Sequence, residues 1–192
     1  MKLVAFNGSP RPRGNTTLML EAMLAEVAKE GIDTELVQIG NQLLHGCRAC
    51  GQCQKRQDRK CSIDDDPMNG YIEKMIAADA IVIGSPTYFA DLTCETKALI
   101  DRCGYVGRVN GDLYRRKVGA AVAAVRRAGA LHVLDSITHF FTIAQMVVVG
   151  SSYWNVGFGR KAGEVEQDVE GMATMVTLGQ NMAWVMKRLH GG

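Results

Sequence analysis

Long apolar runs are missing from this sequence of 192 residues: none approaches the ~18 consecutive apolar residues that a membrane-spanning helix needs. The apolar stretch at residues 2–6 gives way at once to Asn7-Gly8-Ser9-Pro10, so it is too short for the core of a secretory signal. A strong excess of one charge sign is also missing, because 22 Lys and Arg face 20 Asp and Glu, a formal net charge of +2. We therefore expect a cytoplasmic protein whose main partner is neither a nucleic acid nor a membrane.

Proline is scarce as well, with 4 residues against 21 glycines, and this ratio suits tight turns between regular elements. Hydrophobic residues make up 47% and charged residues 22% of the chain, values that are typical of a globular domain. No internal repeat, low-complexity tract or linker divides the sequence. We predict one domain over residues 1–192, with a cysteine-rich insertion at 46–62.

Short apolar segments alternate with helical patterns along the chain. The predicted strands are 2–7, 34–39, 80–84, 117–125 and 145–149. The predicted helices are 15–30, a segment starting near 64–67, 92–102, 129–143 and 164–189, and a glycine-rich loop is expected at 150–163. This alternation indicates an α/β protein whose parallel sheet is covered by helices on both faces. Two architectures have this pattern: one half of a dinucleotide-binding fold, and a flavodoxin-like sheet of strand order 2-1-3-4-5.

The loop between the first strand and the first helix carries a cluster of hydrogen-bond donors. The hydroxyls of Ser9, Thr16 and Thr17 and the charges of Arg11 and Arg13 lie near a predicted helix N-terminus, which attracts anions. The loop lacks the G-x-G-x-x-G fingerprint and the Gly-Lys-Ser/Thr of nucleotide-hydrolysing loops. We interpret it as a phosphate-binding loop; the alternative is a solvated turn with a helix cap.

Two loops of the chain resemble those of a known family. Gly8-Ser9-Pro10-Arg11, continued by Gly14-Asn15-Thr16, resembles the FMN-phosphate loop of the flavodoxin-like NAD(P)H-dependent FMN reductases. Residues 85–89, Ser-Pro-Thr-Tyr-Phe, are similar to the family's second loop, which holds the isoalloxazine ring, and residues 97–102 match as well. The resemblance covers essentially the whole chain. It implies a flavodoxin-like, doubly wound, five-stranded parallel sheet of order 2-1-3-4-5, with FMN as the cofactor.

The resemblance also implies which residues bind FMN. The phosphate would be held by Ser9, Arg11, Asn15, Thr16 and Thr17. The ring would lie against Pro86, Thr87, Tyr88 and Phe89, although the two aromatic side chains have packing in the core as an alternative role. The family's third flavin loop is usually rich in glycine, whereas residues 123–129 here contain the pair Arg126-Arg127. Arg126 is therefore a candidate for cofactor binding, and a pyridine-nucleotide phosphate or water are the alternative contacts of this pair.

Four cysteines are crowded into one segment, as Cys47-x2-Cys50-x2-Cys53-x7-Cys61. In a reducing compartment such a cluster more often binds metal or performs redox chemistry than forms disulfides. The first two spacings are those of ferredoxin runs, while the third, x7 in place of x3, differs. The pattern resembles the iron-sulfur flavoproteins, a branch of the same family, which implies a [4Fe-4S] cluster that exchanges single electrons with FMN.

Other roles for the cysteines remain open at this point. Four thiolates also hold structural zinc, more often as two separated pairs, and the thiols can stay free of metal. The stretch from Cys50 to Arg56 fits the phosphatase pattern C-x5-R, but Gln57 stands where a hydroxyl residue is expected, and no strand directly precedes it. Cys94 and Cys103 are expected to be small buried residues on one helix.

The favoured function is an FMN-dependent oxidoreductase or electron-transfer flavoprotein with a [4Fe-4S] cluster and no covalent nucleophile. The alternatives are an NAD(P)H-dependent FMN or quinone reductase without a cluster, and a zinc-stabilised, non-enzymatic ligand-binding module. The resemblance implies a homodimer or homotetramer, and NAD(P)H or a protein electron carrier as redox partner. Because all strand-to-helix loops of a parallel sheet emerge at one edge, we expect the phosphate, ring and cysteine loops to share that edge.

Overall fold

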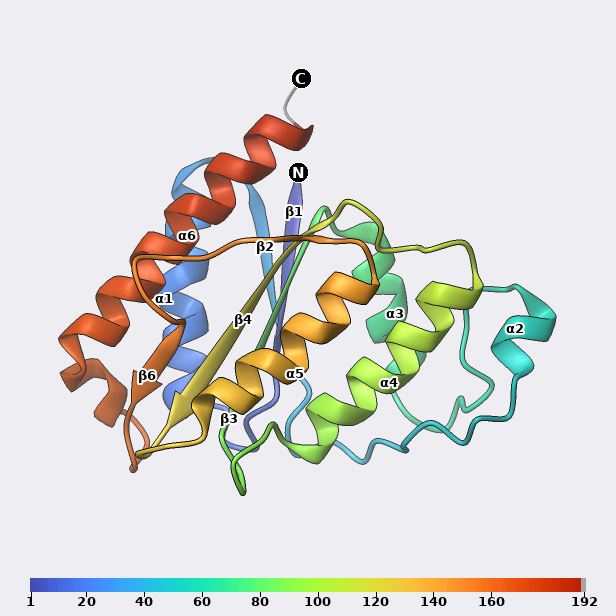
Figure 1. The fold of residues 1–192 in the computed structure, drawn as a ribbon, viewed down its shortest axis with the longest axis horizontal. Coiled ribbons are helices and arrows are strands. Elements are labelled where there is room, and N and C mark those ends of the chain that lie inside the picture. The colour runs from blue at the N-terminus through green and yellow to red at the C-terminus, as the bar shows by residue number, and fades with distance from the viewer. Residues whose placement is uncertain (191–192) are drawn as a thin grey trace.

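The parallel sheet of the computed structural model, which describes residues 1–190, has the strand order β2-β1-β3-β4-β5 (Figure 1). Its strands are β1 (Lys2–Asn7), β2 (Asp33–Gln38), β3 (Ala80–Pro86), β4 (Val118–Val125), β5 (Val147–Val148) and β6 (Val156–Phe158). Every neighbouring pair is parallel, and β6 pairs with β4 beside β5. The flavodoxin-like order predicted from the sequence is confirmed.

The fifth position of the sheet is divided between two short strands. The two-residue β5 pairs with the beginning of β4 at Val118, and the three-residue β6 pairs with its end at Val125. Between them Asn155 bonds to β4 directly: its side-chain amide donates to the Ala121 carbonyl (2.9 Å), and its own carbonyl accepts from Ala123 N–H (2.9 Å). The strand expected at 145–149 is therefore shorter, and part of the expected loop 150–163 is a strand.

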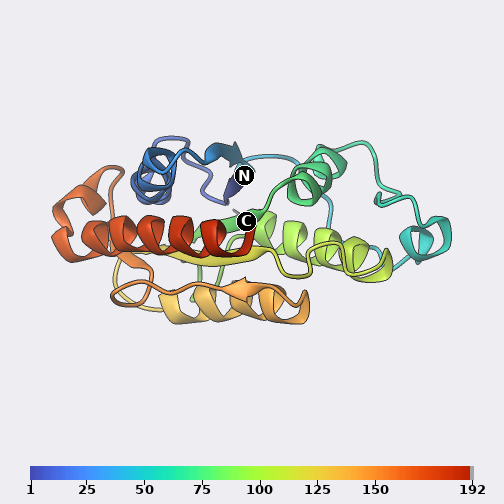
Figure 2. The ribbon, with the colours of Figure 1, turned by 90° about the horizontal axis from the view of Figure 1, so that it is seen from above.

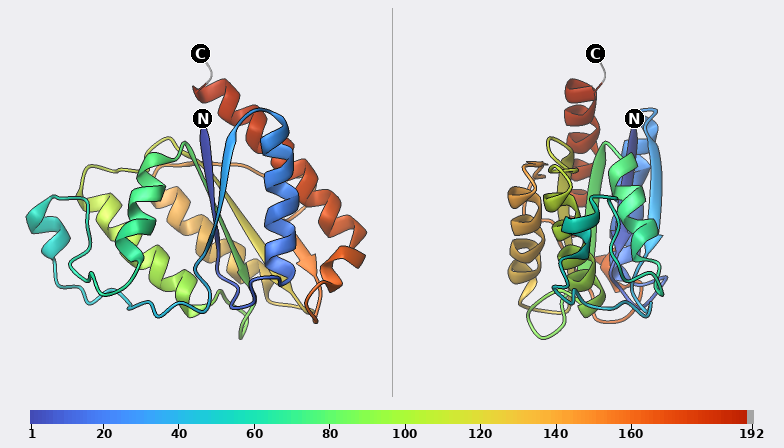
Figure 3. Two further views of the ribbon diagram at one scale, coloured as in Figure 1. Left: turned by 180° about the vertical axis from the view of Figure 1, so that it is seen from behind. Right: turned by 90° about the vertical axis from the view of Figure 1, so that its right-hand side faces the viewer.

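Helices cover both faces of the sheet (Figures 2 and 3). One face carries α1 (Asn15–Lys29) and α6 (Val169–His190), and the other carries α3 (Met68–Ala77), α4 (Cys94–Val109) and α5 (Ala130–Ile143). Two apolar cores result, because alternate residues of each strand point to opposite faces: Leu3 and Ala5 join one core, Val4 and Phe6 the other. A 3₁₀ turn, η1 (Glu164–Gln167), precedes α6, so the last helix begins later than expected.

The carboxyl ends of β1, β3 and β4 lie side by side at the lower edge in Figure 1, which we call the rim. The loops that follow these three strands meet there. The segment after β2 also starts at the rim, but it then runs along α4 to the short helix α2 (Gln52–Arg56) at the far side of the molecule (Figures 1 and 3). The cysteine segment thus emerges at the same rim as the other two loops, as expected, but the cysteines themselves lie away from it, because the segment packs along α4. Among residues 1–190, none of the helices has the length and apolar character needed to cross a membrane.

Candidate functional site

The loop after β1 is built around Asn7, a fully buried polar residue at the end of an apolar strand. Its side-chain amide donates to Thr17 Oγ1 (2.9 Å) and to Gln38 Oε1 (2.8 Å), and its Oδ1 accepts from the Ser9 N–H (3.0 Å). Thr17 Oγ1 in turn donates to the Pro12 carbonyl (2.8 Å). The Thr17 hydroxyl therefore holds the loop in shape through hydrogen bonds within the protein. This structural role differs from the direct phosphate contact expected for it.

Thr16 carries a buried hydroxyl that lacks a hydrogen-bond partner. Its side chain is buried, with 1% exposure, and its Oγ1 has no hydrogen-bond partner. It lies in the first turn of α1, where backbone N–H groups have no acceptor within the helix; the N–H of Leu18 already donates to Gly14 (3.2 Å). A buried hydroxyl without a partner is unfavourable, and a phosphate oxygen at this helix N-terminus would supply one. The site thus fits an anion.

Two glycines allow the loop after β1 to pack tightly around Ser9. A Cβ on Gly40 would lie 2.0 Å from the Ser9 carbonyl oxygen, and one on Gly14 would lie 3.2 Å from Ser9 Oγ. Asn15 faces the segment after β6: its Oδ1 accepts from Val165 N–H (3.4 Å). Arg11 and Arg13 are exposed at the outer side of the loop. Ser9, Asn15 and Thr16 therefore line one narrow turn, with Arg11 free to approach a ligand from solvent.

The loop after β3 forms a tight hairpin that projects from the rim (Figure 1). Tyr88 N–H donates to the Asp91 carbonyl (2.8 Å), and Asp91 N–H donates to the Tyr88 carbonyl (3.0 Å). The two residues between them, Phe89 and Ala90, have φ of 47° and 64°, a conformation that is unfavourable for side chains with a Cβ. Phe89 is fully exposed and Tyr88 is 46% exposed, so neither is a core aromatic. Strain held in an exposed turn is typical of a binding site.

Thr87 connects this hairpin to the sheet. Its N–H donates to the Ala124 carbonyl of β4 (2.8 Å), while its buried Oγ1 has no partner. The start of α5 touches the same hairpin, because Gly129, at φ 89°, lies where a Cβ would be 2.8 Å from Ala90 Cα. The loop after β4 therefore contacts the hairpin, and the loops after β3 and β4 adjoin each other at the rim. Arg126 and Arg127 of this loop are both exposed.

A groove of about 450 Å³ adjoins the rim beside the third loop. Arg127, but not Arg126, lines it, and the aromatic side chains of Tyr153, Trp154 and Phe158 form much of its wall. These three aromatics are more than half exposed. Of the arginine pair, the structure therefore brings Arg127 to a cavity and leaves Arg126 on the open surface.

All four clustered cysteines line a single small pocket, of about 20 Å³, against Arg102, Tyr105 and Val106 of α4. Cys53 is buried and Cys61 half-buried, while Cys47 and Cys50 are exposed. Left-handed backbone at Ala49 (φ 50°) and Gly51 (φ 68°) turns the chain between successive cysteines. This turning explains how Cys47, Cys50 and Cys53 come to line the same pocket.

The thiols of this pocket differ in their surroundings. A hydrogen bond with the Ser62 hydroxyl (3.2 Å), assisted by the Gln52 N–H, lowers the pKa of Cys50, whereas burial raises the pKa of Cys53. Cys61 Sγ accepts a hydrogen bond from Arg102 Nε (3.3 Å). Within residues 1–190, no three His, Cys, Asp or Glu side chains already converge as metal ligands. The donor set itself fits an iron-sulfur cluster, since four cysteines, the number that holds a [4Fe-4S] cluster, line one pocket.

The family model of the NADPH-dependent FMN reductases matches residues 1–161, more than four fifths of the chain. The chain belongs to this family. Two relatives named iron-sulfur flavoprotein, from Methanocaldococcus jannaschii and Methanosarcina thermophila, are each 38% identical to it and each cover 97% of it. The match extends over 98% and 96% of those two proteins. The resemblance to the family and to its iron-sulfur branch is therefore confirmed.

Solved structures support the fold of this FMN reductase family member. RosB with bound 8-demethyl-8-formylriboflavin-5'-phosphate superimposes with a TM-score of 0.76 at 17% identity, covering 100% of this chain and 81% of that one. A WrbA-like flavodoxin from Agrobacterium tumefaciens gives 0.67 at 19% identity, with 98% of both chains covered. The chain is a flavin-dependent oxidoreductase with FMN as its cofactor.

Several residues that shape the site of this reductase carry no motif. Asn7 and Gln38 fix the loop after β1, and Gly40 makes room for it. The one available sequence signal was a polar Asn at the end of an apolar strand. Asn69 and Asn110 hold the cysteine segment by its backbone: Asn69 accepts from the Cys61 N–H (2.8 Å), and Asn110 donates to the Cys53 carbonyl (3.4 Å). Nothing in the spacing of the cysteines points to either residue.

Proposed function

We propose that this FMN-dependent oxidoreductase moves electrons between FMN at the rim and a [4Fe-4S] cluster held by Cys47, Cys50, Cys53 and Cys61. The observation that carries the proposal is that all four cysteines line one pocket. The two relatives named iron-sulfur flavoprotein, alike over nearly their whole length, support it. When bound, FMN supplies hydride and single-electron chemistry, and the cluster supplies single-electron exchange.

In this proposal, the residues of the rim bind and orient the flavin. Ser9, Asn15, Thr16 and the first amides of α1 hold the phosphate, and Arg11 closes over it from solvent. Thr87, whose buried hydroxyl lacks a partner, lies where it can bond a polar edge of the ring. The strained turn at Phe89 and Ala90 holds the hairpin close to that ring. The electron donor we propose is NADPH, after the family's description, with a protein carrier as the other candidate partner.

The position of the cysteine pocket favours electron transfer between subunits. Arg102, Tyr105 and Val106 lie eight to twelve residues beyond Cys94, the first residue of α4, which corresponds to about 12–18 Å along the helix axis. The pocket is thus well separated from the rim of its own chain. A homodimer or homotetramer that places the rim of one subunit against the pocket of another would shorten the distance. Exposed aromatics at the rim, with Phe89 at the tip of its hairpin, suit such a contact.

The decisive experiment is the spectrum and metal content of protein purified without oxygen. We expect FMN absorption together with a broad iron-sulfur band, and about four iron and four acid-labile sulfide per chain. FMN without iron or sulfide would instead support the plain FMN or quinone reductase. Zinc in place of iron, with no flavin spectrum, would support the ligand-binding module and contradict the proposal.

The oligomer has its own test. Phe89→Asn is expected to weaken self-association about tenfold or more, because burying a phenylalanine side chain contributes about 1.5–3 kcal/mol. Asparagine tolerates the left-handed backbone of this position, so the fold should persist. Trp184→Ser, which removes an exposed aromatic of α6, is the matched control and should leave assembly unchanged. Light scattering across a dilution series measures both; a wild-type monomer at micromolar concentration, or dissociation only of the Trp184 variant, would contradict this interface.

A further inference from the structure

Arg102 is the largest fully buried side chain of the described residues, with 1% exposure. A guanidinium is rarely removed from water unless its donors all find partners. It lies on α4, outside the cysteine segment and outside the loops that line the rim. Its burial therefore needs an explanation that the flavin site does not supply.

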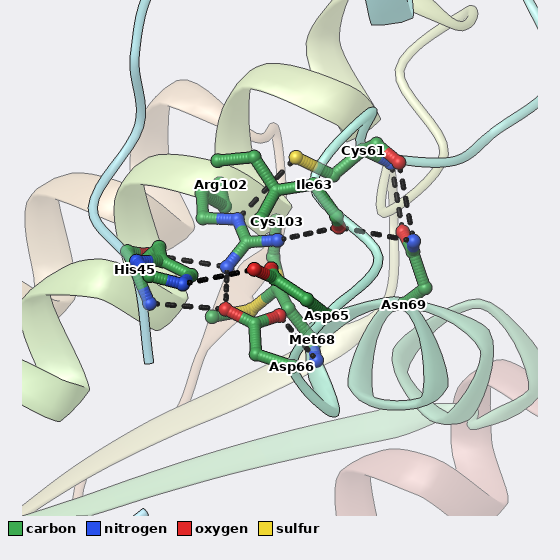
Figure 4. A network of polar contacts seen from close by, with 9 residues as sticks. All are labelled: His45, Cys61, Ile63, Asp65, Asp66, Met68, Asn69, Arg102 and Cys103. Atoms are coloured by element: carbon green, nitrogen blue, oxygen red, sulfur yellow. Dashed lines mark hydrogen bonds and ion pairs between the residues drawn. The ribbon is translucent and has the colours of Figure 1, made fainter. Parts of the chain in front are cut away.

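The partners of Arg102 lie on both sides of the cysteines in the sequence (Figure 4). Nη1 donates to the carbonyl of His45 (3.1 Å), just before Cys47, and forms an ion pair with Asp66, just after Cys61. Nη2 donates to the carbonyl of Ile63 (2.9 Å). The guanidinium thus joins the chain just before the cysteines and the chain just after them to one point of α4.

The Nε donor of Arg102 points at a cysteine. Its Nε–H donates to Cys61 Sγ (3.3 Å), the one thiol of the pocket that has a charged hydrogen-bond donor in the described structure (Figure 4). Asp66 balances the guanidinium charge, so the pair is formally neutral and the N–H remains directed at sulfur. Hydrogen bonds to cluster sulfurs are one of the means by which a protein sets the reduction potential.

We propose that Arg102 is a positioning residue of the metal centre: it holds the Cys61 sulfur toward the pocket and stabilises the more negative, reduced state of the bound cluster. This inference rests on the proposed function for the cluster itself. In a purely structural role, Arg102 would only hold the cysteine segment against α4 and would not influence the bound metal.

Asn69 provides the comparison that separates these roles. It binds Cys61 through the backbone only, accepting from its N–H (2.8 Å) and donating to its carbonyl (3.1 Å), and it does not touch the sulfur. Asn69→Ala loosens the same ligand without changing its hydrogen bond. The test variant is the double substitution Arg102→Gln with Asp66→Asn, which removes the N–H···S bond and leaves no unpaired buried charge. Arg102→Lys keeps the charge and loses the planar donor.

The experiment has two readouts, neither of which is catalytic activity. The first is the affinity of the oxygen-free apoprotein for Co²⁺, followed by thiolate-to-cobalt absorption. The second is the midpoint potential of the cluster, from a redox titration followed by electron paramagnetic resonance. In the double variant we expect Co²⁺ binding about 10–100-fold weaker and a lower midpoint potential. Arg102→Lys should lower the potential too, whereas Asn69→Ala should leave it at the wild-type value.

Wild-type affinity and potential in the folded double variant would overturn the inference. If that variant does not fold, a wild-type potential in Arg102→Lys overturns it equally, as does the same potential shift in Asn69→Ala. A wild-type chain that binds Co²⁺ but never iron would refute the cluster proposal, while the Co²⁺ affinities of the variants would still decide the role of Arg102. A wild-type chain that binds neither metal overturns both.

Discussion

Cys53→Ser is expected to abolish iron binding and to leave FMN bound at the wild-type stoichiometry. Cys53 lies on α2 and is the most deeply buried of the four clustered cysteines, so no outside thiol can take its place. A serine hydroxyl is a poor ligand for iron in a cluster, and three remaining thiolates leave one iron without its protein ligand. The loops proposed to bind FMN follow β1 and β3, well away from α2, so the flavin should be unaffected. The iron, acid-labile sulfide and flavin contents of protein purified without oxygen test this expectation.

Cys94→Ser is the matched control. Cys94 is exposed at the first turn of α4, where its thiol donates to Glu95 Oε2 (3.3 Å), and it does not line the cysteine pocket. This variant should keep both iron and FMN. Cys50→Ser should behave like Cys53→Ser even though Cys50 is exposed. Iron at the wild-type level in both Cys50→Ser and Cys53→Ser would remove these residues as ligands.

A functional consequence separates the two cofactors. The Cys53→Ser protein should still be reduced at its flavin by NADPH, because the rim is intact. It should deliver electrons poorly to a one-electron acceptor, since the proposed exit through the cluster is lost. Stopped-flow absorbance of flavin reduction and of its reoxidation by such an acceptor gives the two rates. Equal reoxidation rates in variant and wild type would show that electrons leave from the flavin directly.

Strands β1, β3 and β4 were predictable because buried parallel strands are nearly continuous apolar runs. Their order was implied by the resemblance of two loops to the FMN reductases, and the apolar runs alone left two architectures open. The divided fifth position was not predictable. Strands of two and three residues are too short to show a period, and the gap between them is filled by Asn155 through a side-chain bond to β4. A polar side chain that replaces ladder hydrogen bonds leaves no pattern in the sequence.

The cysteine spacing indicated which residues share a pocket, but not where that pocket lies. Its place depends on contacts with α4 that are distant in the sequence: Arg102 is 41 residues from Cys61, and Gln57 donates to the Val109 carbonyl (2.6 Å). In the same way, motif matching placed Thr17 beside Thr16 as a phosphate ligand. Only the structure shows that the Thr17 hydroxyl is already engaged by Asn7 and Pro12 while that of Thr16 is not.

Arg11→Ala combined with Thr16→Ala is expected to weaken FMN binding by about 1.5–3 kcal/mol for each residue, because both make hydrogen bonds to a charged phosphate in the proposed site. Together this is roughly a 10²–10⁴-fold increase in the dissociation constant. Arg13→Ala, which removes another exposed arginine of the same loop, is the matched control and should change the affinity little. Fluorescence titration of the apoprotein with FMN measures the three affinities, and unchanged affinity in the double variant would rule out this placement.

The Thr16 substitution alone has a more specific signature. Its buried Oγ1 has no partner in the ligand-free fold, so Thr16→Ala removes an unsatisfied polar atom and should not lower the free energy of unfolding of the apoprotein. The same substitution should weaken FMN binding, and Thr16→Ser, which restores the hydroxyl, should recover most of the loss. An ordinary structural hydroxyl would show the reverse: a less stable apoprotein and an FMN affinity close to that of the wild type. Comparing urea unfolding of the apoprotein with the FMN titration therefore decides whether the Thr16 hydroxyl serves to bind the phosphate.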